Sequence, residues 1–328
     1  MTDEALQPAR RAVDAVRVAG VLAYVVGVIV YLEYFGLPKQ TVEAVLWIYL
    51  GTVAWDVRRP LREHLVFLRD WWPPFAVFTF YLYSRGLSDD LGIFSVHVTE
   101  PIEADKWLFG GTLPTEFLQA HLCGVPCERS MPPNWYDVLL TTVYYSHFFA
   151  AIGVAAYLWK RNRHQWVRYM RRWLTVIVAA VVCFVVYPMA PPWMASRDGY
   201  ITEDISRITG RGWDFTTGDG GGGGAAAHQS VSAVGNQVAA MPSLHAGFAV
   251  LVAWWGISQM RSGWRWLLLL YPLTMTLMLV YYAEHYVVDA IAGALLVAAA
   301  MGFWAWWERR RTAGAAEPAG EAELTATR

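Results

Sequence analysis

Two short stretches of the chain combine residues that could do chemistry. The first, residues 240–245, reads Ala-Met-Pro-Ser-Leu-His and stands where a long apolar run begins. Proline is favoured in the first turn of a helix, and a helix N-terminus offers free backbone N–H groups and a positive dipole end, which bind phosphate. Ser243 adds a hydroxyl donor and His245 an ionisable imidazole. The stretch therefore predicts an anion-binding site with a proton donor built into it.

The second stretch, residues 281–289, reads Tyr-Tyr-Ala-Glu-His-Tyr-Val-Val-Asp and lies between two apolar runs. His285 and Asp289 are four residues apart, so they share one helix face and can form a hydrogen bond. Asp289 would then fix the tautomer of His285 and raise the basicity of its other nitrogen. A lone histidine at a membrane interface is more often structural, but ionisable groups at membrane depth are costly. Two histidines and an aspartate at one membrane face therefore favour a catalytic site.

These stretches resemble the second and third signature motifs of the type 2 phosphatidic acid phosphatase superfamily. The matching residues are Pro242-Ser243-Leu244-His245 and His285-Tyr286-Val287-Val288-Asp289. Within the superfamily, Ala190-Pro191-Pro192-Trp193 and Glu284-His285-Tyr286 are similar to sequences of the branch that contains the inositol phosphorylceramide synthases, which are inositolphosphotransferases. The similarity covers about residues 190–293.

The resemblance implies a reaction and a role for each residue. It implies phosphoryl transfer through a covalent phosphohistidine, with His285 as the nucleophile and Asp289 holding it. His245 would protonate the leaving oxygen and then deprotonate the acceptor. Ser243 and Glu284 would belong to the substrate-binding residues. No metal ion or other cofactor is implied.

Two departures from the superfamily pattern concern its cations. The first motif, a Lys followed seven residues later by Arg-Pro, is not intact, because Arg59-Pro60 is present but position 52 is Thr. The Ser-Arg pair that opens the third motif is replaced by Met278-Leu279. The loss of these phosphate-clamping cations fits the transferase branch better than a generic phosphatase.

Some other cation must then clamp the phosphoryl group, since unpaired charge away from water costs several kcal/mol. Arg197 is the first candidate, because it follows Pro191-Pro192-Trp193, a stiff exit from an apolar run. Arg207 and Arg211 lie nearer the glycine run at 220–224. The alternative is that Arg197 only meets lipid headgroups.

The composition indicates which elements must position these residues. Of the 328 residues, 56% are hydrophobic and only 16% charged, with 18 Trp and 17 Tyr. A soluble globular domain has about a quarter charged residues. The net charge of −1 also excludes the basic stripe of a nucleic-acid-binding protein. The composition therefore predicts an integral membrane protein.

Eight apolar runs could cross a bilayer, which takes about 17–25 helical residues. They cover approximately residues 18–35, 41–56, 71–87, 136–159, 173–190, 244–260, 265–282 and 286–307. We predict an all-α polytopic membrane protein with about eight transmembrane helices, of which the later six form the catalytic bundle. The predicted division is 1–60 (N-terminal cytoplasmic segment and first two spans), 61–311 (catalytic membrane domain) and 312–328 (disordered cytoplasmic tail).

The distribution of Lys and Arg predicts the orientation, because basic residues concentrate in cytoplasmic loops. With a cytoplasmic N-terminus, 19 of the 26 basic residues fall inside and 7 outside. Both termini are therefore expected in the cytoplasm and both motifs on the extracytoplasmic side. The basic residues are nearly all Arg and Ala is abundant, which is typical of a GC-rich bacterial genome, so we expect a bacterial plasma membrane.

Four other features of the sequence are interpreted without a role in catalysis. His147 is interpreted as a core histidine bonded to a hydroxyl, and Asp137 as a helix cap. Cys123 and Cys127 form a disulfide or stay free with equal weight. A zinc site with His121 lacks a second ligand pair.

Three functions stay open. If a small alcohol or a lipid hydroxyl accepts the phosphoryl group from a membrane lipid donor, the protein is a phosphotransferase. If water accepts it, the protein is a lipid phosphatase, for example for polyprenyl phosphates. The third hypothesis is a lipid or anion transporter, which the gathering of ionisable residues at one face, instead of along a midplane path, argues against.

Overall fold

A computed structural model describes residues 7–35, 41–91, 93–216 and 238–325, and the regular structure of these residues is helical apart from two isolated β-bridges. The elements are α1 (Gln7–Phe35), α2 (Thr41–Trp55), α3 (Leu61–Leu91), α4 (Thr99–Leu108), α5 (Pro114–Leu122), α6 (Trp135–Arg161), α7 (Arg163–Val186), α8 (Pro192–Arg197), η2 (Arg211–Thr216), α10 (Leu244–Gln259), η3 (Gly263–Leu269), α11 (Leu270–Tyr281) and α12 (Val287–Thr325).

Helices stand at all eight positions where the sequence predicts a span. Four stretches are long and apolar enough to cross a membrane: Ala15–Phe35, Arg163–Val186, Gly263–Tyr281 and Val287–Thr312. The two halves of α6, Trp135–His147 and Phe149–Arg161, meet at an angle of 48° and together make a fifth. The described residues thus form an integral membrane protein with four to five such spans, and the count of eight stays a prediction.

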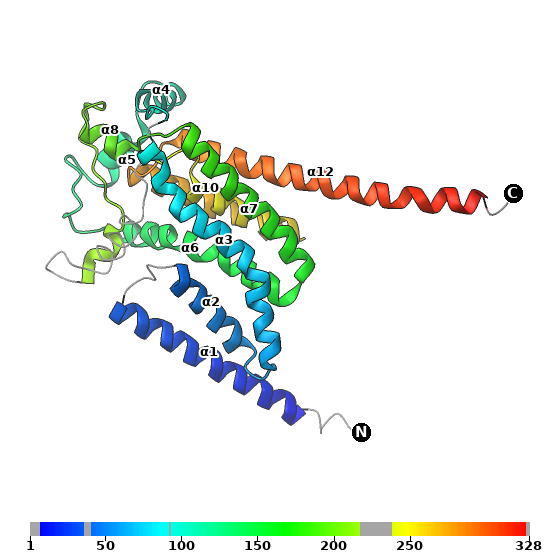
Figure 1. The fold of residues 1–328 in the computed structure, drawn as a ribbon. Coiled ribbons are helices and arrows are strands. Elements are labelled where there is room, and N and C mark those ends of the chain that lie inside the picture. The colour runs from blue at the N-terminus through cyan, green and yellow to red at the C-terminus, as the bar shows by residue number, and fades with distance from the viewer. Residues whose placement is uncertain (1–6, 36–40, 92, 217–237, 326–328) are drawn as a thin grey trace.

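Six helices form the bundle that the sequence predicts: α3, α6, α7, α10, α11 and α12. The central helix is α10, which packs against α6, α7, α11 and α12. It is apolar on all sides, as expected for a helix that other helices surround. The hairpin of α1 and α2 lies outside the bundle and reaches it mainly through α3 (Figure 1).

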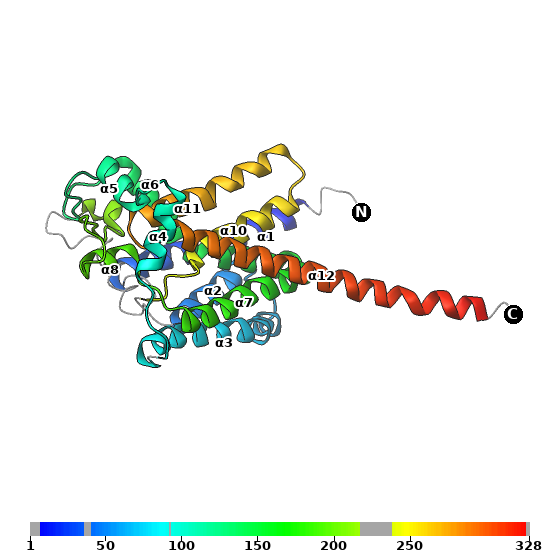
Figure 2. The same ribbon diagram turned by 90° about the horizontal axis from the view of Figure 1, so that it is seen from above.

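The short helices α4, α5 and α8 and the 3-10 turn η2 form a cap over one end of the bundle, and we call them the cap (Figures 1 and 2). α10 and α12 both begin at this end, and α11 ends there. The two candidate motifs therefore lie together beneath the cap.

The last helix is longer than the sequence predicts. α12 continues to Thr325 and projects beyond the bundle (Figure 1). The segment predicted as a disordered tail from residue 312 is therefore helical through Thr325, because Ala and Glu, which favour helix, dominate it. The domain boundaries themselves stay predictions, and the glycine run at 220–224 lies outside the described residues.

Candidate active site

The first motif lies where α10 begins. Ser243 caps the helix: its Oγ accepts a hydrogen bond from the backbone N–H of Ala246 at 3.4 Å, and its own N–H donates to the backbone carbonyl oxygen of Asp289 at 3.0 Å. Gly293, one turn after Asp289 on α12, packs directly against Ser243. A Cβ at position 293 would stand closer than 3.0 Å to the carbonyl oxygen of Ser243. The two motifs are thus joined backbone to backbone, with no room for a side chain at position 293.

The second motif lies in the turn between α11 and α12. α11 ends in a Schellman motif, in which the N–H of Ala283 donates to the Val280 carbonyl at 3.1 Å and that of Glu284 to the Leu279 carbonyl at 3.0 Å. Ala283 has a φ of 61°, a left-handed conformation that favours glycine. This abrupt helix end places Glu284 and His285 in the turn, immediately before α12 begins.

His285 and Asp289 form the predicted hydrogen bond, but they do not share a helix face, because His285 lies in the turn before α12 begins at Val287. Nδ1 of His285 lies 3.2 Å from Oδ2 of Asp289. The Asp289 carboxylate is fully buried and also accepts the backbone N–H of Tyr286 at 2.9 Å. A proton on Nδ1 of His285 is thus held by the carboxylate, which leaves the lone pair on Nε2.

A second buried carboxylate, which the sequence analysis missed, supports the same turn. Asp105 of α4 accepts the backbone N–H groups of Val287 and Val288 at 2.9 and 3.0 Å and so caps the first turn of α12. Burial raises the pKa of the Asp105 carboxyl, and the two N–H donors counteract only part of that rise. No motif marks this contact, because it joins residues more than 180 positions apart.

His245 lies in the first turn of α10, with its ring centroid 5.5 Å from that of His285. The ring of Tyr144 stacks against it at 5.2 Å, and that of His147 lies at 4.1 Å. His147 is buried, as predicted, and its Nδ1 is bonded to the backbone carbonyl of Tyr144 at 2.6 Å. The structure therefore places a third histidine, His147, beside His245 and His285 of the two motifs.

Glu284 is mostly buried and holds an arginine beside the turn. Both of its carboxylate oxygens accept hydrogen bonds from Arg207, at 2.8 and 3.0 Å, and Thr209 donates to one of them. Burial alone would raise the pKa of Glu284, but the charge and hydrogen bonds of Arg207, with the bond from Thr209, lower it overall. The guanidinium of Arg207 also lies over the Trp193 ring, 4.8 Å from its centroid.

Arg197, the first candidate for the clamp, has other partners. Its guanidinium forms two hydrogen bonds with Asp198, at 2.7 and 3.0 Å, and its side chain is 55% exposed. Like Arg207, it lies over the Trp193 ring, at 5.3 Å. Of these two arginines, Arg207 is the one bonded to a residue of the second motif.

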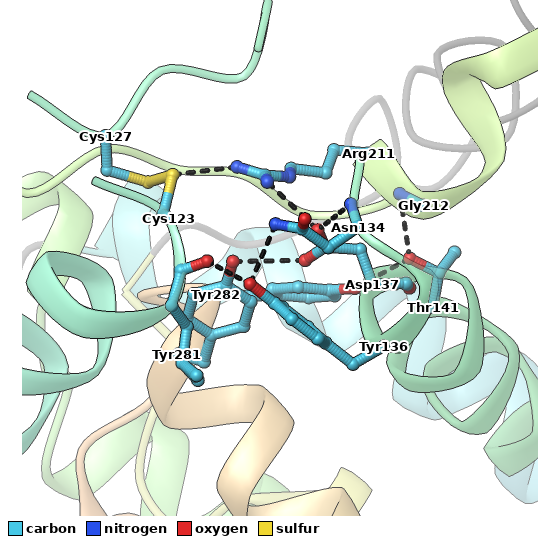
Figure 3. A network of polar contacts seen from close by, with 11 residues as sticks. Cys123, Cys127, Asn134, Tyr136, Asp137, Thr141, Arg211, Gly212, Tyr281 and Tyr282 are labelled. Carbon is cyan, nitrogen blue, oxygen red and sulfur yellow. Dashed lines mark hydrogen bonds and ion pairs between the residues drawn. A yellow bond between two sulfur atoms is a disulfide. The ribbon is translucent and has the colours of Figure 1, made fainter. Parts of the chain in front are cut away.

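Under the cap, Asp137 is the centre of a buried polar network (Figure 3). It caps α6 as predicted, because its carboxylate accepts the backbone N–H of Asn134 at 2.7 Å. Arg211, 1% exposed, lies 2.9 Å from the same carboxylate, and the hydroxyl of Tyr281 donates to it at 3.0 Å. The structure also contains the Cys123–Cys127 disulfide, and Arg211 contacts its sulfur. The network ties the cap to the end of α11 that leads into the second motif.

Comparison with known proteins identifies the family. The model of the PAP2 superfamily matches residues 130–303, which include both motifs, α6 through α11 and the first part of α12. The chain belongs to the PAP2 superfamily. No curated protein and no solved structure matches the chain. Membership in the PAP2 superfamily suggests a membrane-bound lipid phosphatase or phosphotransferase.

The PAP2 match leaves α1 to α5 outside its range. Arg59-Pro60, the remnant of the missing first motif, therefore lies outside the part that defines the family here. Met278 and Leu279, which stand where the third motif usually begins with Ser-Arg, are fully buried among apolar residues. These positions cannot supply a cation to the candidate site. Among the described residues, no group of three or more His, Cys, Asp and Glu side chains is arranged to hold a metal ion.

Proposed function

We propose that the protein is a membrane phosphotransferase of the inositolphosphotransferase-like kind. It moves a phosphoryl group or phospho-headgroup from a lipid-linked donor to an alcohol acceptor. The observation that carries this proposal is the buried Asp289 carboxylate on Nδ1 of His285, with the His245 ring 5.5 Å away. This arrangement gives a nucleophile with an orienting carboxylate and a second imidazole across from it.

The reaction proceeds in two steps, and the proton that His245 gives up in the first step returns to it in the second. In the first, the Nε2 lone pair of His285 forms a bond to phosphorus, the bond from phosphorus to the leaving oxygen breaks, and His245 gives its proton to that oxygen. In the second, His245 takes a proton from the acceptor alcohol, whose oxygen displaces His285 from phosphorus. The protein ends in the protonation state in which it began.

Two groups stabilise the charge of the phosphoryl oxygens in this proposal. The first turn of α10, capped by Ser243, supplies backbone N–H groups and the positive dipole end. Arg207 supplies the cation, and Glu284 orients it through two hydrogen bonds. Arg197 is exposed and bound to Asp198, so in this proposal it contacts lipid headgroups and does not clamp the phosphoryl group.

Hydrolysis is the second candidate function. Membership in the PAP2 superfamily favours hydrolysis as much as transfer. If water replaces the alcohol as the acceptor, the same site is a phosphatase for lipid phosphates or polyprenyl (pyro)phosphates. The specific observation that favours transfer is the apolar, buried pair Met278 and Leu279, where the phosphatase pattern has Ser-Arg. A transporter remains the third hypothesis, and the gathering of the ionisable side chains beneath the cap argues against it.

We further propose that the cap faces the extracytoplasmic side of a bacterial plasma membrane and that both termini are cytoplasmic. The charge distribution supports this orientation, since 19 of 26 basic residues then lie inside. The donor is accordingly a lipid of the outer leaflet. The division of the chain into a catalytic membrane domain at 61–311 and flanking segments is part of the same proposal.

The experiment is a reaction of the purified protein with labelled donors. Liposomes that contain phosphatidylinositol, phosphatidic acid or a polyprenyl phosphate, each labelled on phosphorus, are incubated with and without inositol, a sugar or a lipid alcohol. We expect labelled phosphorus in a new phosphoester only when an acceptor is present. Free phosphate or phosphatidic acid as the sole product, whatever alcohol is added, would show a hydrolase.

A further inference from the structure

His147 is a buried histidine that the proposed reaction does not use. It belongs to α6, and its side chain has little exposure to solvent. Its ring centroid lies 4.1 Å from that of His245, with an angle of 60° between the planes, which is direct ring contact. His147 is thus closer to the proposed proton donor than the proposed nucleophile is, at 5.5 Å.

The backbone around His147 holds its ring in one orientation. Its Nδ1 lies 2.6 Å from the carbonyl oxygen of Tyr144, so the ring donates this N–H to the backbone. α6 bends by 48° between Trp135–His147 and Phe149–Arg161, so the bend falls immediately after this residue. A helix normally bends where its regular hydrogen bonding is interrupted. The bend and the hydrogen bond together fix where the ring of His147 meets α10.

His147 and Tyr144 lie one turn apart on α6 and both contact the ring of His245. The Tyr144 ring is nearly parallel to it, at 18°, and the His147 ring meets it at a steep angle. His285 lies against it from the turn before α12. The ring of His245 is therefore enclosed by rings from two elements, so its direction depends on them.

We propose that His147 is a positioning residue for His245, which directs the imidazole of His245 at the leaving oxygen of the substrate. The inference rests on the proposed function, because it needs His245 to be the proton donor. A donor in general acid catalysis must lie within hydrogen-bond reach of the atom that it protonates, and small displacements are costly. His147 touches no reacting atom in this scheme and acts only through His245.

The test uses two substrates that differ in their need for a proton donor. Dodecyl phosphate has an alkoxide leaving group, which must be protonated as it departs. 4-Nitrophenyl phosphate has a leaving group that departs without a proton. Because His245 is also the base of the second step for both substrates, the comparison uses the first step alone, measured as the release of dodecanol or 4-nitrophenol in a single turnover. In that step a residue that acts through His245 affects dodecyl phosphate and spares 4-nitrophenyl phosphate, whereas a residue that only supports the fold affects both alike.

We expect His147→Ala to lower the single-turnover rate of dodecanol release by roughly tenfold or more, and that of 4-nitrophenol release by less than about threefold. His147→Phe keeps a ring but has no N–H donor, and it should behave like His147→Ala. His147→Asn can donate to the same carbonyl but has no ring to contact His245, so it should recover little of the rate. Adding His147→Ala to His245→Ala should cause no further loss.

The matched control is His121→Ala. His121 also bonds a backbone carbonyl through Nδ1, that of Phe117 at 2.7 Å, but it is exposed on α5. This variant should keep the wild-type rate on both substrates. His147→Phe with full activity, or equal losses on both substrates in His147→Ala, would overturn the proposal.

The same experiment separates the inference from the proposed function. If His245→Ala slows the single-turnover release of dodecanol and of 4-nitrophenol equally, His245 is not the proton donor and the proposed mechanism fails. If His245→Ala spares the release of 4-nitrophenol while His147→Ala shows no such selectivity, the mechanism stands and only the role of His147 is wrong.

Discussion

Gly293→Ala should separate the two motifs and thereby abolish most activity. A Cβ at this position would stand closer than 3.0 Å to the Ser243 carbonyl oxygen and 3.3 Å from the backbone nitrogen of Gly247. Carbon atoms in contact prefer about 3.5–4.0 Å, so the start of α10 must move by roughly 1 Å. A misplacement of about 1 Å in a catalytic arrangement can cost about 100-fold in rate.

The stability effect of Gly293→Ala should be smaller than its effect on rate. Overpacking a tight contact costs about 1–3 kcal/mol, which corresponds to a fall in Tm of roughly 2–12 °C. The assay is kcat on a lipid phosphate in detergent micelles, together with Tm of the same preparation. We expect a rate loss of about 100-fold in a protein that is still folded at the assay temperature.

Gly302→Ala on the same helix is the matched control. Nothing lies within 4 Å of a Cβ at position 302. Replacing a glycine inside a helix by alanine stabilises it by about 0.5–1 kcal/mol. Gly302→Ala should therefore keep full activity and an equal or higher Tm. If Gly293→Ala is as active as Gly302→Ala, the close approach of α10 and α12 does not position the site, and this reasoning is refuted.

Three further predictions follow from the site, the cap and the charge distribution. Arg207→Ala should lower kcat by roughly tenfold or more, and Arg207→Lys should recover little, because lysine lacks the bidentate fork. Asp137→Asn leaves the buried Arg211 without its carboxylate, which should cost about 3–5 kcal/mol and lower Tm by roughly 6–20 °C. In a Cys183→Ala background, Tyr200→Cys should react with a membrane-impermeant thiol reagent on intact cells, and Asn162→Cys should not.

Each of these predictions has a control or a contradicting result. Arg197→Ala should keep a rate near that of the wild type. A large loss of rate in Arg197→Ala, with none in Arg207→Ala, would show that Arg197 is the cation that binds the phosphoryl group. Glu63→Gln removes an exposed ion pair with Arg59 and should change Tm little, since such pairs contribute about 0–1 kcal/mol. If Asp137→Asn is equally harmless, the network under the cap is not structural. The reverse labelling pattern would place the cap in the cytoplasm.

The sequence was sufficient to predict the fold class and the contacts that local spacing determines. The apolar runs predicted the helical membrane bundle, since each span must satisfy its own backbone hydrogen bonds. The four-residue spacing predicted the bond between His285 and Asp289, and the Pro-Ser pair predicted the start of α10. The PAP2 motifs predicted the family that the comparison shows.

The sequence could not predict the contacts that join distant segments. Asp105 caps α12, and Arg207 reaches Glu284 from a loop, without any spacing that marks either pair. Proline and tryptophan near Arg197 suggested a stiff loop over the site, but in the structure Arg197 pairs with the adjacent Asp198. The sequence indicated only a packing role for His147, because no spacing marks its contact with His245 of another helix.

The most direct test of the proposed mechanism is the detection of the phosphoenzyme. His245→Ala treated with 4-nitrophenyl phosphate labelled on phosphorus should complete the first step, since that leaving group needs no proton, and then stall for lack of a base. We expect acid-labile, alkali-stable label on the peptide that contains His285, and none in the His245→Ala/His285→Ala double variant. Label that persists without His285, or full turnover by His285→Ala, would contradict the phosphohistidine mechanism.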